Sequence, residues 1–412
     1  MPARLAAAAS LLALALAAPA AAEVKLSPPQ SVGMAPAGLA KLNAEMHALV
    51  DAGKLAGVTT LVARRGKVVH FDAYGKRDAE TGAPIAKDTI FRIASMTKPV
   101  TGVAMMMLYE EGRWKLDDPV AKHIPEFANL KVKTADGQLV PQAHPMTMAE
   151  LMSHTAGFDV SAGYEAANIG PRDKPLQYMI DKLATMPLVD QPGTDWNYGP
   201  SVNIQGYIVE KLSGQSLDRF FQTRIFAPLG MTDTGFWVAP EKVGRVSRVH
   251  TYDPAGKLIA APTTVDPASR PVFLAGSGGL FSTTEDYWRF ASMLENDGSF
   301  NGRRLLKPET VKLMRTSVLK SGVLVDLYGP AQPGIGFGMD VAIVEDSKAA
   351  STPQAVGSNY WGGAFGTWYW VDPANDLVFV GMIQNLRGSV PGAGTPEVRG
   401  QSVKLVYDAL KR

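Results

Sequence analysis

The sequence predicts an α/β fold in which one antiparallel sheet is built from both ends of the chain and is flanked by helices. Three observations support this prediction. Strand-forming residues dominate 57–75, and they return between 360 and 384. Between about 113 and 265 the chain instead shows helical spacing and long loops, with little strand character. We therefore expect a mainly helical domain to be inserted between the two parts that form the sheet.

This interpretation gives a division of the chain into three units. The predicted units are a signal peptide at 1–22, a discontinuous α/β domain at 23–100 and 266–412, and a mainly helical domain at 101–265. A cleft between the two domains is the default place for a functional site.

Residues 1–22 have the pattern of a secretory signal. Arg4 provides a short positive start, Leu5–Ala18 is apolar, and Ala20–Ala22 is a small-residue cleavage site that leaves Glu23 as the mature N-terminus. The apolar run is too short for a membrane span, and no later stretch has the length and polarity of one. We therefore expect a periplasmic or secreted protein.

Composition excludes several classes of function. The 412 residues are 46% hydrophobic, so the chain can bury a large core. A net charge of +2 gives no reason to expect a nucleic acid or an anionic membrane as partner. The chain has no cysteine, which excludes disulfides and thiolate metal sites, and its six histidines form no metal-binding motif. Composition therefore gives no reason to expect a thiolate or histidine metal site.

The predicted elements near the N-terminus are one helix and one hairpin. Leu39, Leu42 and Met46 recur at helical spacing within a helix predicted over 36–57. Two strand-forming runs then flank a turn at Arg65-Gly66, which predicts a β-hairpin over 57–75.

The remaining elements follow from the same spacing rules. Thr284 or Ser282 is placed to cap the helix that begins near Asp286. Helices are predicted over Met148–His154, Leu176–Met186, Val202–Leu212, Leu217–Ile225, Asp286–Leu294 and Thr395–Leu410, and strands over Tyr360–Val371 and Leu377–Gln384, joined by a turn at 372–376.

The segment around Ser95 is the one on which the functional prediction depends. We expect a buried helix over Ser95–Glu111, because Pro99 is tolerated in a first turn and Gly112 is a typical stop. Ser95 and Lys98 are three residues apart, so they share a helix face. A lysine can activate a serine nucleophile only if its pKa is depressed, and burial can depress it.

Ser-x-x-Lys is a weak pattern when it stands alone. The chain contains a second copy at Ser317 and Lys320, in a mixed polar stretch that we interpret as surface. Ser95 could also be a helix cap beside a solvated lysine. The apolar run Thr101–Tyr109 favours a buried lysine, and a buried lysine needs a reason.

A tyrosine is the best candidate partner for Ser95. Tyr198 lies in the loop 192–200, just before a predicted helix. With a lysine nearby it could ionise more easily than usual and shuttle a proton. The alternative, an aromatic side chain that packs the loop, is comparable on the sequence alone.

A third candidate region is Trp361-Gly362-Gly363, at the start of a strand-forming run. Glycines there would let a ligand approach the backbone of an edge strand. A backbone N–H of this region, with that of Ser95, would form a two-donor oxyanion hole. The alternative is a β-bulge with a packed tryptophan.

Two other residues were weighed as functional groups. His154, at a predicted helix end, is better interpreted as a buried, hydrogen-bonded structural residue. Ser277, in Ala275-Gly276-Ser277-Gly278-Gly279, comes within one residue of a nucleophile elbow. The last histidine, His250, precedes Ser277, so the order of the triad fails and we do not assign Ser277 as a nucleophile.

Taken together, these motifs resemble the serine β-lactamase and penicillin-binding-protein superfamily, and within it the family VIII carboxylesterases and related class C β-lactamase-like proteins. The likeness covers most of the mature chain. It rests on Ser95–Lys98, Leu151–Phe158, Pro192–Tyr198, Ile225–Thr234 and Gly278–Thr283.

The resemblance implies roles for particular residues and a β-lactamase-like fold. It implies that Ser95 is acylated, that Lys98 and Tyr198 are the general base and acid pair, and that the backbone N–H groups of Ser95 and Ala364 form the oxyanion hole. It also implies substrate contacts from Trp361, Gly362 and Gly363. The leading hypothesis is an exported serine hydrolase that cleaves a small-molecule carboxylic ester and needs no cofactor.

Two departures from the β-lactamase pattern bear on the substrate. Pro200 stands where Tyr-x-Asn has its Asn, and Trp361-Gly362-Gly363 stands where Lys-Thr-Gly is usual. Losing a charged contact with the substrate costs about 1.5–3 kcal/mol of binding free energy. The two departures therefore favour uncharged acyl esters as substrates. The alternatives are a β-lactamase or D-Ala-specific peptidase and, from another class, a non-catalytic cell-wall-binding relative.

Overall fold

A seven-stranded antiparallel sheet lies at the centre of the computed structural model, which describes residues 24–158, 169–262, 265–327, 330–386 and 396–411. Its strands run in the order β11-β12-β13-β14-β15-β1-β2. Their bounds are β1 Gly57–Arg64, β2 Lys67–Gly75, β11 Ile335–Phe337, β12 Ala342–Val344, β13 Asn359–Gly362, β14 Trp368–Asp372 and β15 Leu377–Met382. The two ends of the chain join where β1 pairs with β15, so the predicted sheet is confirmed.

The strands of the C-terminal half differ from the prediction. The run Tyr360–Val371 is two strands, β13 and β14, because the chain turns at 363–367. The strands β11 and β12 were not predicted, since three-residue buried strands show no alternation. β13 is not an edge strand, but its pairing with β12 stops at Tyr360, which leaves its last two residues unpaired on that side.

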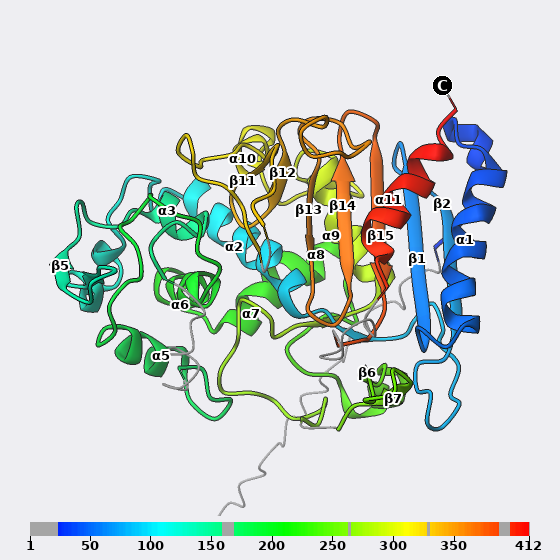
Figure 1. The fold of residues 1–412 in the computed structure, drawn as a ribbon, viewed down its shortest axis with the longest axis horizontal. Helices are drawn as coiled ribbons and strands as arrows, with labels where there is room; N and C mark the ends of the chain where they lie inside the picture. Colours follow the sequence, from blue (N-terminus) through cyan, green and yellow to red (C-terminus); the bar gives the residue numbers. More distant parts are fainter. Residues whose placement is uncertain (1–23, 159–168, 263–264, 328–329, 387–395, 412) are drawn as a thin grey trace, which may run out of the picture.

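Helices cover both faces of the sheet (Figure 1). On one face lie α1, Pro36–Asp51, and α11, Val398–Asp408, which contact each other. On the other lies α9, Thr284–Glu295, packed against β14 and β15. Side chains of β14 alternate accordingly: Trp370 enters the core under α1 and α11, whereas Tyr369 enters the core on the side of α9.

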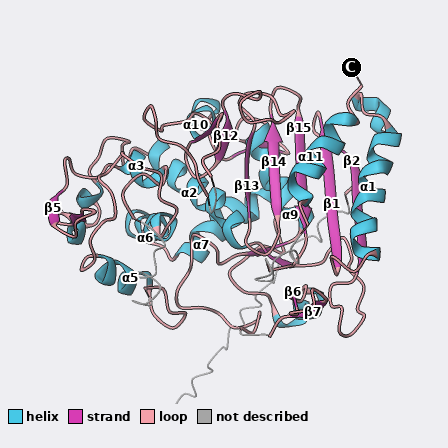
Figure 2. Cartoon of the chain, viewed as in Figure 1, coloured by secondary structure: helices cyan, strands magenta, loops and turns pink. Residues whose placement is uncertain are grey.

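The middle of the chain is mainly helical and lies to one side of the sheet (Figure 2). It contains α3 Met148–Met152, α5 Leu176–Leu183, α6 Ser201–Ser213, α7 Leu217–Phe221, a π-helical turn Gln222–Phe226 and α8 Ala227–Leu229. The predicted helices are therefore present, but two short hairpins, β4–β5 (Lys131–Lys133, Leu139–Pro141) and β6–β7 (His250–Tyr252, Leu258–Ala260), lie among them.

One hydrophobic core connects the two parts. It runs from Val380 on the sheet through α2, Thr97–Glu110, to Met179 in α5. The helix α2 packs against α6 and is buried along most of its length, so it lies between the sheet and the helical part. The domain boundaries at 100 and 266 remain a prediction.

The described residues also form smaller elements, among them short 3-10 helices at Pro29–Val32, Val120–Lys122, Pro125–Phe127 and Pro240–Arg245. Others are the strand pairs β3–β8 (Phe91–Arg92, Phe281–Ser282) and β9–β10 (Ser299–Phe300, Arg303–Arg304), and the helix α10, Pro308–Met314. The helix α9 begins after Thr283, whose Oγ1 accepts the N–H of Asp286 at 3.1 Å. The predicted caps, Thr284 and Ser282, were wrong, because Thr283 is the last residue with extended backbone.

The predicted signal peptide at 1–22 lies outside the described residues. In the part of the chain that the structure describes, no helix is both long enough and apolar enough to cross a bilayer.

Candidate active site

The Ser95 segment sits at a sharp turn that leads into α2. Ala94 has a positive φ of 45°, and Ala94–Met96 forms a single 3-10 turn before α2 begins at Thr97. Pro99 falls in the first turn of α2, and Gly112, with φ 70°, follows its end. The predicted buried helix is therefore confirmed, with Ser95 in the lead-in turn instead of the α-helix itself.

Lys98 is buried and points at Ser95. Its side chain is held by two contacts: Nζ donates to the Ser277 carbonyl oxygen at 2.8 Å and to Ser95 Oγ at 3.2 Å. Only 3% of Lys98 is exposed, and burial lowers its pKa to about 7. A substantial fraction of Lys98 is therefore neutral near pH 7, as a general base must be.

Tyr198 lies on the other side of the same amine. The Lys98 Nζ is 4.4 Å from the centre of its ring, and its phenol shares a hydrogen bond with the Ser95 side chain. Burial raises the pKa of Tyr198 to about 12, although the Ser95 contact opposes this. The expectation that Tyr198 ionises more easily than usual was therefore wrong, because desolvation outweighs the hydrogen bonds from Ser95 and Trp361 and the positive charge of Arg399. A protonated phenol can still donate or relay a proton.

An aromatic cluster fixes Tyr198. Its members are His154, Trp196, Tyr198, Phe337 and Trp361, with ring centres 5.0–5.8 Å apart in the contacting pairs. His154 is fully buried, and burial holds its pKa well below the usual range. Its ring nitrogens have no hydrogen-bond partner among the described residues, so the structural interpretation stands but the expected side-chain hydrogen bonds do not.

The start of the β13–β14 turn lies against the Ser95 segment. Thr367 Oγ1 donates to the Ile93 carbonyl oxygen at 3.1 Å, and a Cβ on Gly363 would lie only 2.2 Å from that oxygen. This contact places residues 363–364 beside the nucleophile turn. The oxyanion hole from the N–H groups of Ser95 and Ala364 stays a prediction.

Protein atoms fill the space beside both predicted substrate-binding glycines. A Cβ on Gly362 would lie 2.5 Å from the Arg399 guanidinium carbon. Trp361 is 5% exposed and its ring packs against Tyr198. Packing against the Ile93 carbonyl oxygen therefore requires glycine at 363, whereas a side chain at 362 would only have to displace the end of the Arg399 side chain. Substrate contacts from Trp361, Gly362 and Gly363 remain a prediction.

Several site residues have no signal in the sequence. Asn203 Oδ1 accepts the Ser277 N–H at 2.9 Å and so holds the carbonyl that orients Lys98. Ser277 thus takes part through its backbone. Asp340 and Gln205, which are described below, were also missed. None of these three side chains was part of a recognised motif: Asn203 and Gln205 lie on α6, after the loop that carries Tyr198, and Asp340 comes from the turn between β11 and β12.

The second Ser-x-x-Lys copy has none of this setting. The side chain of Lys320 is 59% exposed and pairs with Glu150 at 3.4 Å, as expected for a surface lysine.

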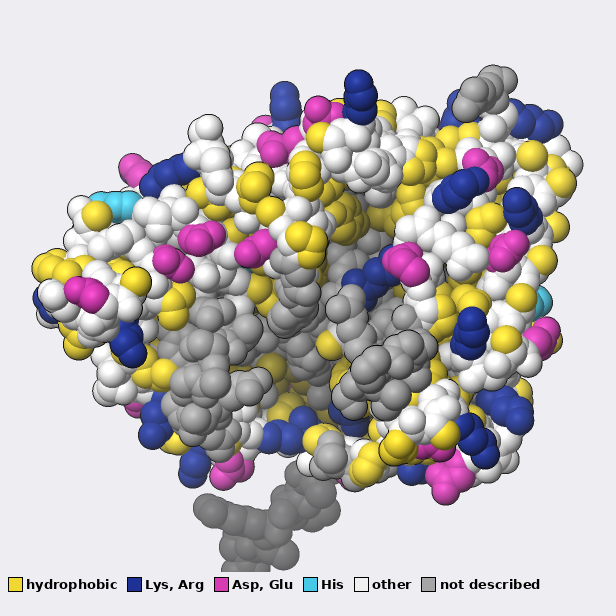
Figure 3. Space-filling view, viewed as in Figure 1, with side chains coloured by type: hydrophobic (Ala, Val, Ile, Leu, Met, Phe, Trp, Pro, Cys, Tyr) yellow, Lys and Arg dark blue, Asp and Glu magenta, His cyan; other side chains and the backbone are white. Residues whose placement is uncertain are grey.

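In the view of Figure 3, hydrophobic side chains gather around the hollow between the helical part and the sheet.

Fold and sequence together define the class of protein. The chain matches the Beta-lactamase family over residues 42–402, and we conclude that it belongs to this family. It is a serine hydrolase of that family, with esterase-like relatives.

Three individual proteins show which members of the family this chain resembles. Esterase EstB of Burkholderia gladioli is 31% identical over 82% of this chain and 88% of its own length. Protein Rv1367c of Mycobacterium tuberculosis is 35% identical over 83% of this chain and 89% of its own. The solved structure of EstCE1, described as a hydrolase with promiscuous acyltransferase activity, is 26% identical, covers 91% of this chain and 99% of its own, and superposes with a TM-score of 0.76.

Proposed function

We propose that this protein is an exported esterase that cleaves uncharged carboxylic esters through an acyl-enzyme on Ser95. The observation that carries the proposal is the buried Lys98 amine, 3.2 Å from Ser95 Oγ with a pKa lowered to about 7. A neutral amine at that distance can take the hydroxyl proton as Ser95 attacks a carbonyl.

The second half of the cycle uses Tyr198. As Ser95 Oγ bonds to the carbonyl carbon, its proton passes to Lys98, and the tetrahedral oxyanion accepts the N–H groups of Ser95 and Ala364. Tyr198, still protonated, gives its proton to the leaving alcohol and is recharged from Lys98. Water then reverses the path and releases the acid.

The surroundings of Trp361 support an uncharged substrate. The β-lactamase pattern has a lysine at this position, and here the ring is packed on Tyr198. The nearby cation Arg399 donates to the carbonyl oxygens of Gly363 at 2.9 Å and Thr367 at 3.4 Å. A substrate carboxylate would have to compete with these contacts.

The test compares the mature chain from Glu23 with Ser95→Ala on a p-nitrophenyl ester series and a chromogenic cephalosporin. We expect ester turnover, little cephalosporin turnover, and loss of activity in Ser95→Ala by at least about a thousandfold. The control is Lys320→Met, which removes the exposed lysine of the other Ser-x-x-Lys copy and should leave turnover within about twofold.

Two outcomes would redirect the proposal. A cephalosporin turned over faster than the esters would favour the β-lactamase alternative. Failure of a fluorophosphonate probe to label Ser95 would favour a non-catalytic relative. Retained ester turnover in Ser95→Ala would remove the mechanism altogether.

The pH dependence follows from Lys98. Because the base must be neutral and its pKa lies at about 7, kcat/KM should rise with pH and level off above that value. A rate that is flat between pH 5 and 9 would contradict this assignment.

Export rests on residues 1–22 alone. We expect the mass of the protein isolated from a secreting host to correspond to a start at Glu23. An unprocessed N-terminus found in the cytoplasm would reject export without affecting the esterase proposal.

A further inference from the structure

A buried carboxyl group lies near Lys98 and has no part in the mechanism above. Asp340 occupies the turn between β11 and β12, with a positive φ of 63° and no exposed surface. Its backbone N–H donates to the Met152 carbonyl oxygen at 3.2 Å, which ties the turn to the end of α3.

The carboxyl group is held on one side and open on the other. Asp340 Oδ1 accepts from Gln205 Nε2 at 3.1 Å, and the same amide donates to the Leu151 carbonyl oxygen at 3.2 Å. The other oxygen, Oδ2, has no hydrogen-bond partner among the described residues. A buried, unpaired carboxylate oxygen is costly, so its retention calls for a reason.

The open oxygen lies against α2. A Cβ on Gly102 would be only 3.0 Å from Asp340 Oδ2, so the carboxyl group occupies the space that any larger residue would fill. Gly102 is four residues after Lys98, one turn along the same helix face. The absent side chain at 102 therefore lets an acidic group sit next to the face that carries Lys98.

The ionisable groups around Asp340 come from four elements. They are Lys98 on α2, Tyr198 before α6, Tyr369 on β14 and, beyond Lys98, His154 after α3. The negative charge of Asp340 raises the pKa of Lys98 and of both tyrosines, whereas burial raises the pKa of Asp340 itself and Lys98 lowers it. Of these groups, only Lys98 can offset the charge of Asp340 with a full positive charge near neutral pH.

We propose that Asp340 is a positioning residue that stabilises Lys98 in its charged form when Lys98 has taken the Ser95 proton. The inference rests on the proposed function. In the step concerned, the Ser95 Oγ–H bond breaks, Oγ bonds to the carbonyl carbon, and the proton makes Lys98 an ammonium ion. The Asp340 carboxylate, fixed by Gln205, balances that charge until Tyr198 passes a proton to the leaving alcohol.

A purely structural role must be distinguished from this one. Aspartate tolerates the left-handed conformation of a tight turn, and so does asparagine. Asp340→Asn therefore keeps the turn, the volume and an acceptor for Gln205, but cannot ionise. The matched control is Asp376→Asn, the same change at a left-handed aspartate (φ 53°) in the exposed β14–β15 turn.

The decisive measurement is the titration of Lys98 by NMR of ε-carbon-labelled lysine, with the signal assigned by its loss in Lys98→Met. In Asp340→Asn we expect the midpoint to fall by about one pH unit or more, and in Asp376→Asn to stay in place. An unchanged midpoint in Asp340→Asn would overturn the proposal. The rising limb of the fluorophosphonate labelling rate should shift in the same direction and by the same amount.

The two proposals fail in different ways. If the wild type hydrolyses no ester, the proposed function fails, while the NMR titration still decides whether Asp340 charges Lys98. If Asp340→Asn does not fold, Asp340→Gly, which also suits the turn, replaces it in the same titration. A midpoint equal to that of the wild type in Asp340→Gly would equally reject the inference.

Discussion

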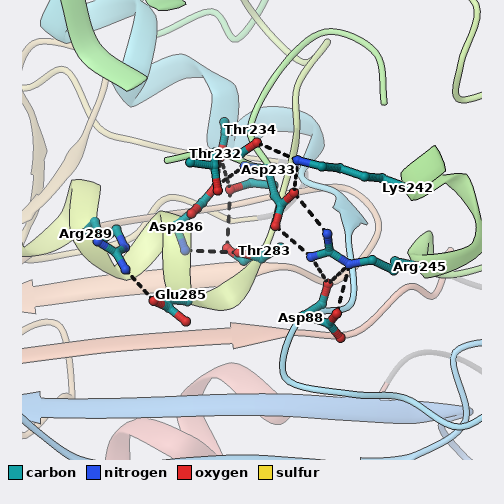
Figure 4. Close-up of polar contacts among 11 residues, drawn as sticks. Asp88, Thr232, Asp233, Thr234, Lys242, Arg245, Thr283, Glu285, Asp286 and Arg289 are labelled. Carbon is teal, nitrogen blue, oxygen red and sulfur yellow. Dashed lines mark hydrogen bonds and ion pairs between the residues drawn. The ribbon is translucent and has the colours of Figure 1, made fainter. Parts of the chain in front are cut away.

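Two buried aspartates of this protein have similar burial and different surroundings. Asp286, in the first turn of α9, accepts the Asp233 N–H at 2.8 Å and the Thr234 hydroxyl at 2.9 Å, both on Oδ2 (Figure 4). Figure 4 also shows Asp233 held by Lys242 and Arg245. Asp340 has one bond on one oxygen and none on the other among the described residues.

The difference separates a carboxyl group with a structural role, Asp286, from one that we propose acts on the charge of Lys98, Asp340. Burial raises the pKa of both groups, so a raised pKa does not by itself mark a functional residue. Asp286 fastens the segment around Asp233 to α9, at a helix N-terminus that favours its charge. Asp340 faces the helix that carries Lys98, and its Oδ2 has no hydrogen-bond partner in the part of the chain that the structure describes. The partners, more than the degree of burial, indicate what each group does.

The largest expected effect comes from removing the amine itself. Lys98→Met should lower kcat/KM for an ester substrate by about a hundred- to ten-thousandfold, because no base remains. If Asp340 acts through Lys98, Asp340→Asn should then cause no further change in the pH profile of the double variant. A pH shift that persists without Lys98 would show that the two aspartates differ for another reason.

An intermediate effect is expected at the structural aspartate. Asp286→Ala leaves the Asp233 N–H and the Thr234 hydroxyl without their acceptor, at a cost of about 1–3 kcal/mol in the free energy of unfolding. Urea denaturation measures this cost. The folded variant should keep the wild-type pH profile of hydrolysis, because Asp286 lies outside the site. A shifted pH profile of hydrolysis would mean that Asp286 also acts on the site, as we propose for Asp340.

The smallest effect is expected for Asp286→Asn at pH 5, where the carboxyl group is mostly neutral. Asparagine can accept the same two bonds, so the variant should lie within about 1 kcal/mol of the wild type. The pKa of Asp286 is raised to about 7 in the fold. Its contribution to stability is therefore complete below about pH 4, the unfolded value, and is lost as pH rises through 7.

The comparison that checks this sign is the melting temperature of both proteins from pH 4 to 9. The wild type should lose stability relative to Asp286→Asn between about pH 4 and the folded pKa of about 7, and the difference should stay constant above that. If the wild type instead becomes more stable relative to the variant as pH rises, the hydrogen bonds from Asp233 and Thr234 keep the carboxylate ionised in the fold.

Much of the architecture was predictable because it depends on short spacings. The hairpin turn at Arg65-Gly66 takes up two residues with positive φ, as its sequence indicates. Gly112 ends the Ser95 helix, and the three-residue interval from Ser95 to Lys98 brings their side chains together. Helical periodicity likewise located both ends of α6 and the start of α1, although α1 ends at Asp51, well before the predicted end at 57.

The sequence by itself determined the family, the Ser95–Lys98 pair and the sheet formed by the two chain ends, because motifs and periodicities are local. Only the tertiary structure decided the rest of the site. It brought Asn203 to the Ser277 segment that holds Lys98 and Asp340 to the helix α2 that carries Lys98. It also raised the pKa of Tyr198, where a neighbouring lysine had suggested the opposite. Burial and long-range contacts set these properties, and neither is a function of spacing along the chain.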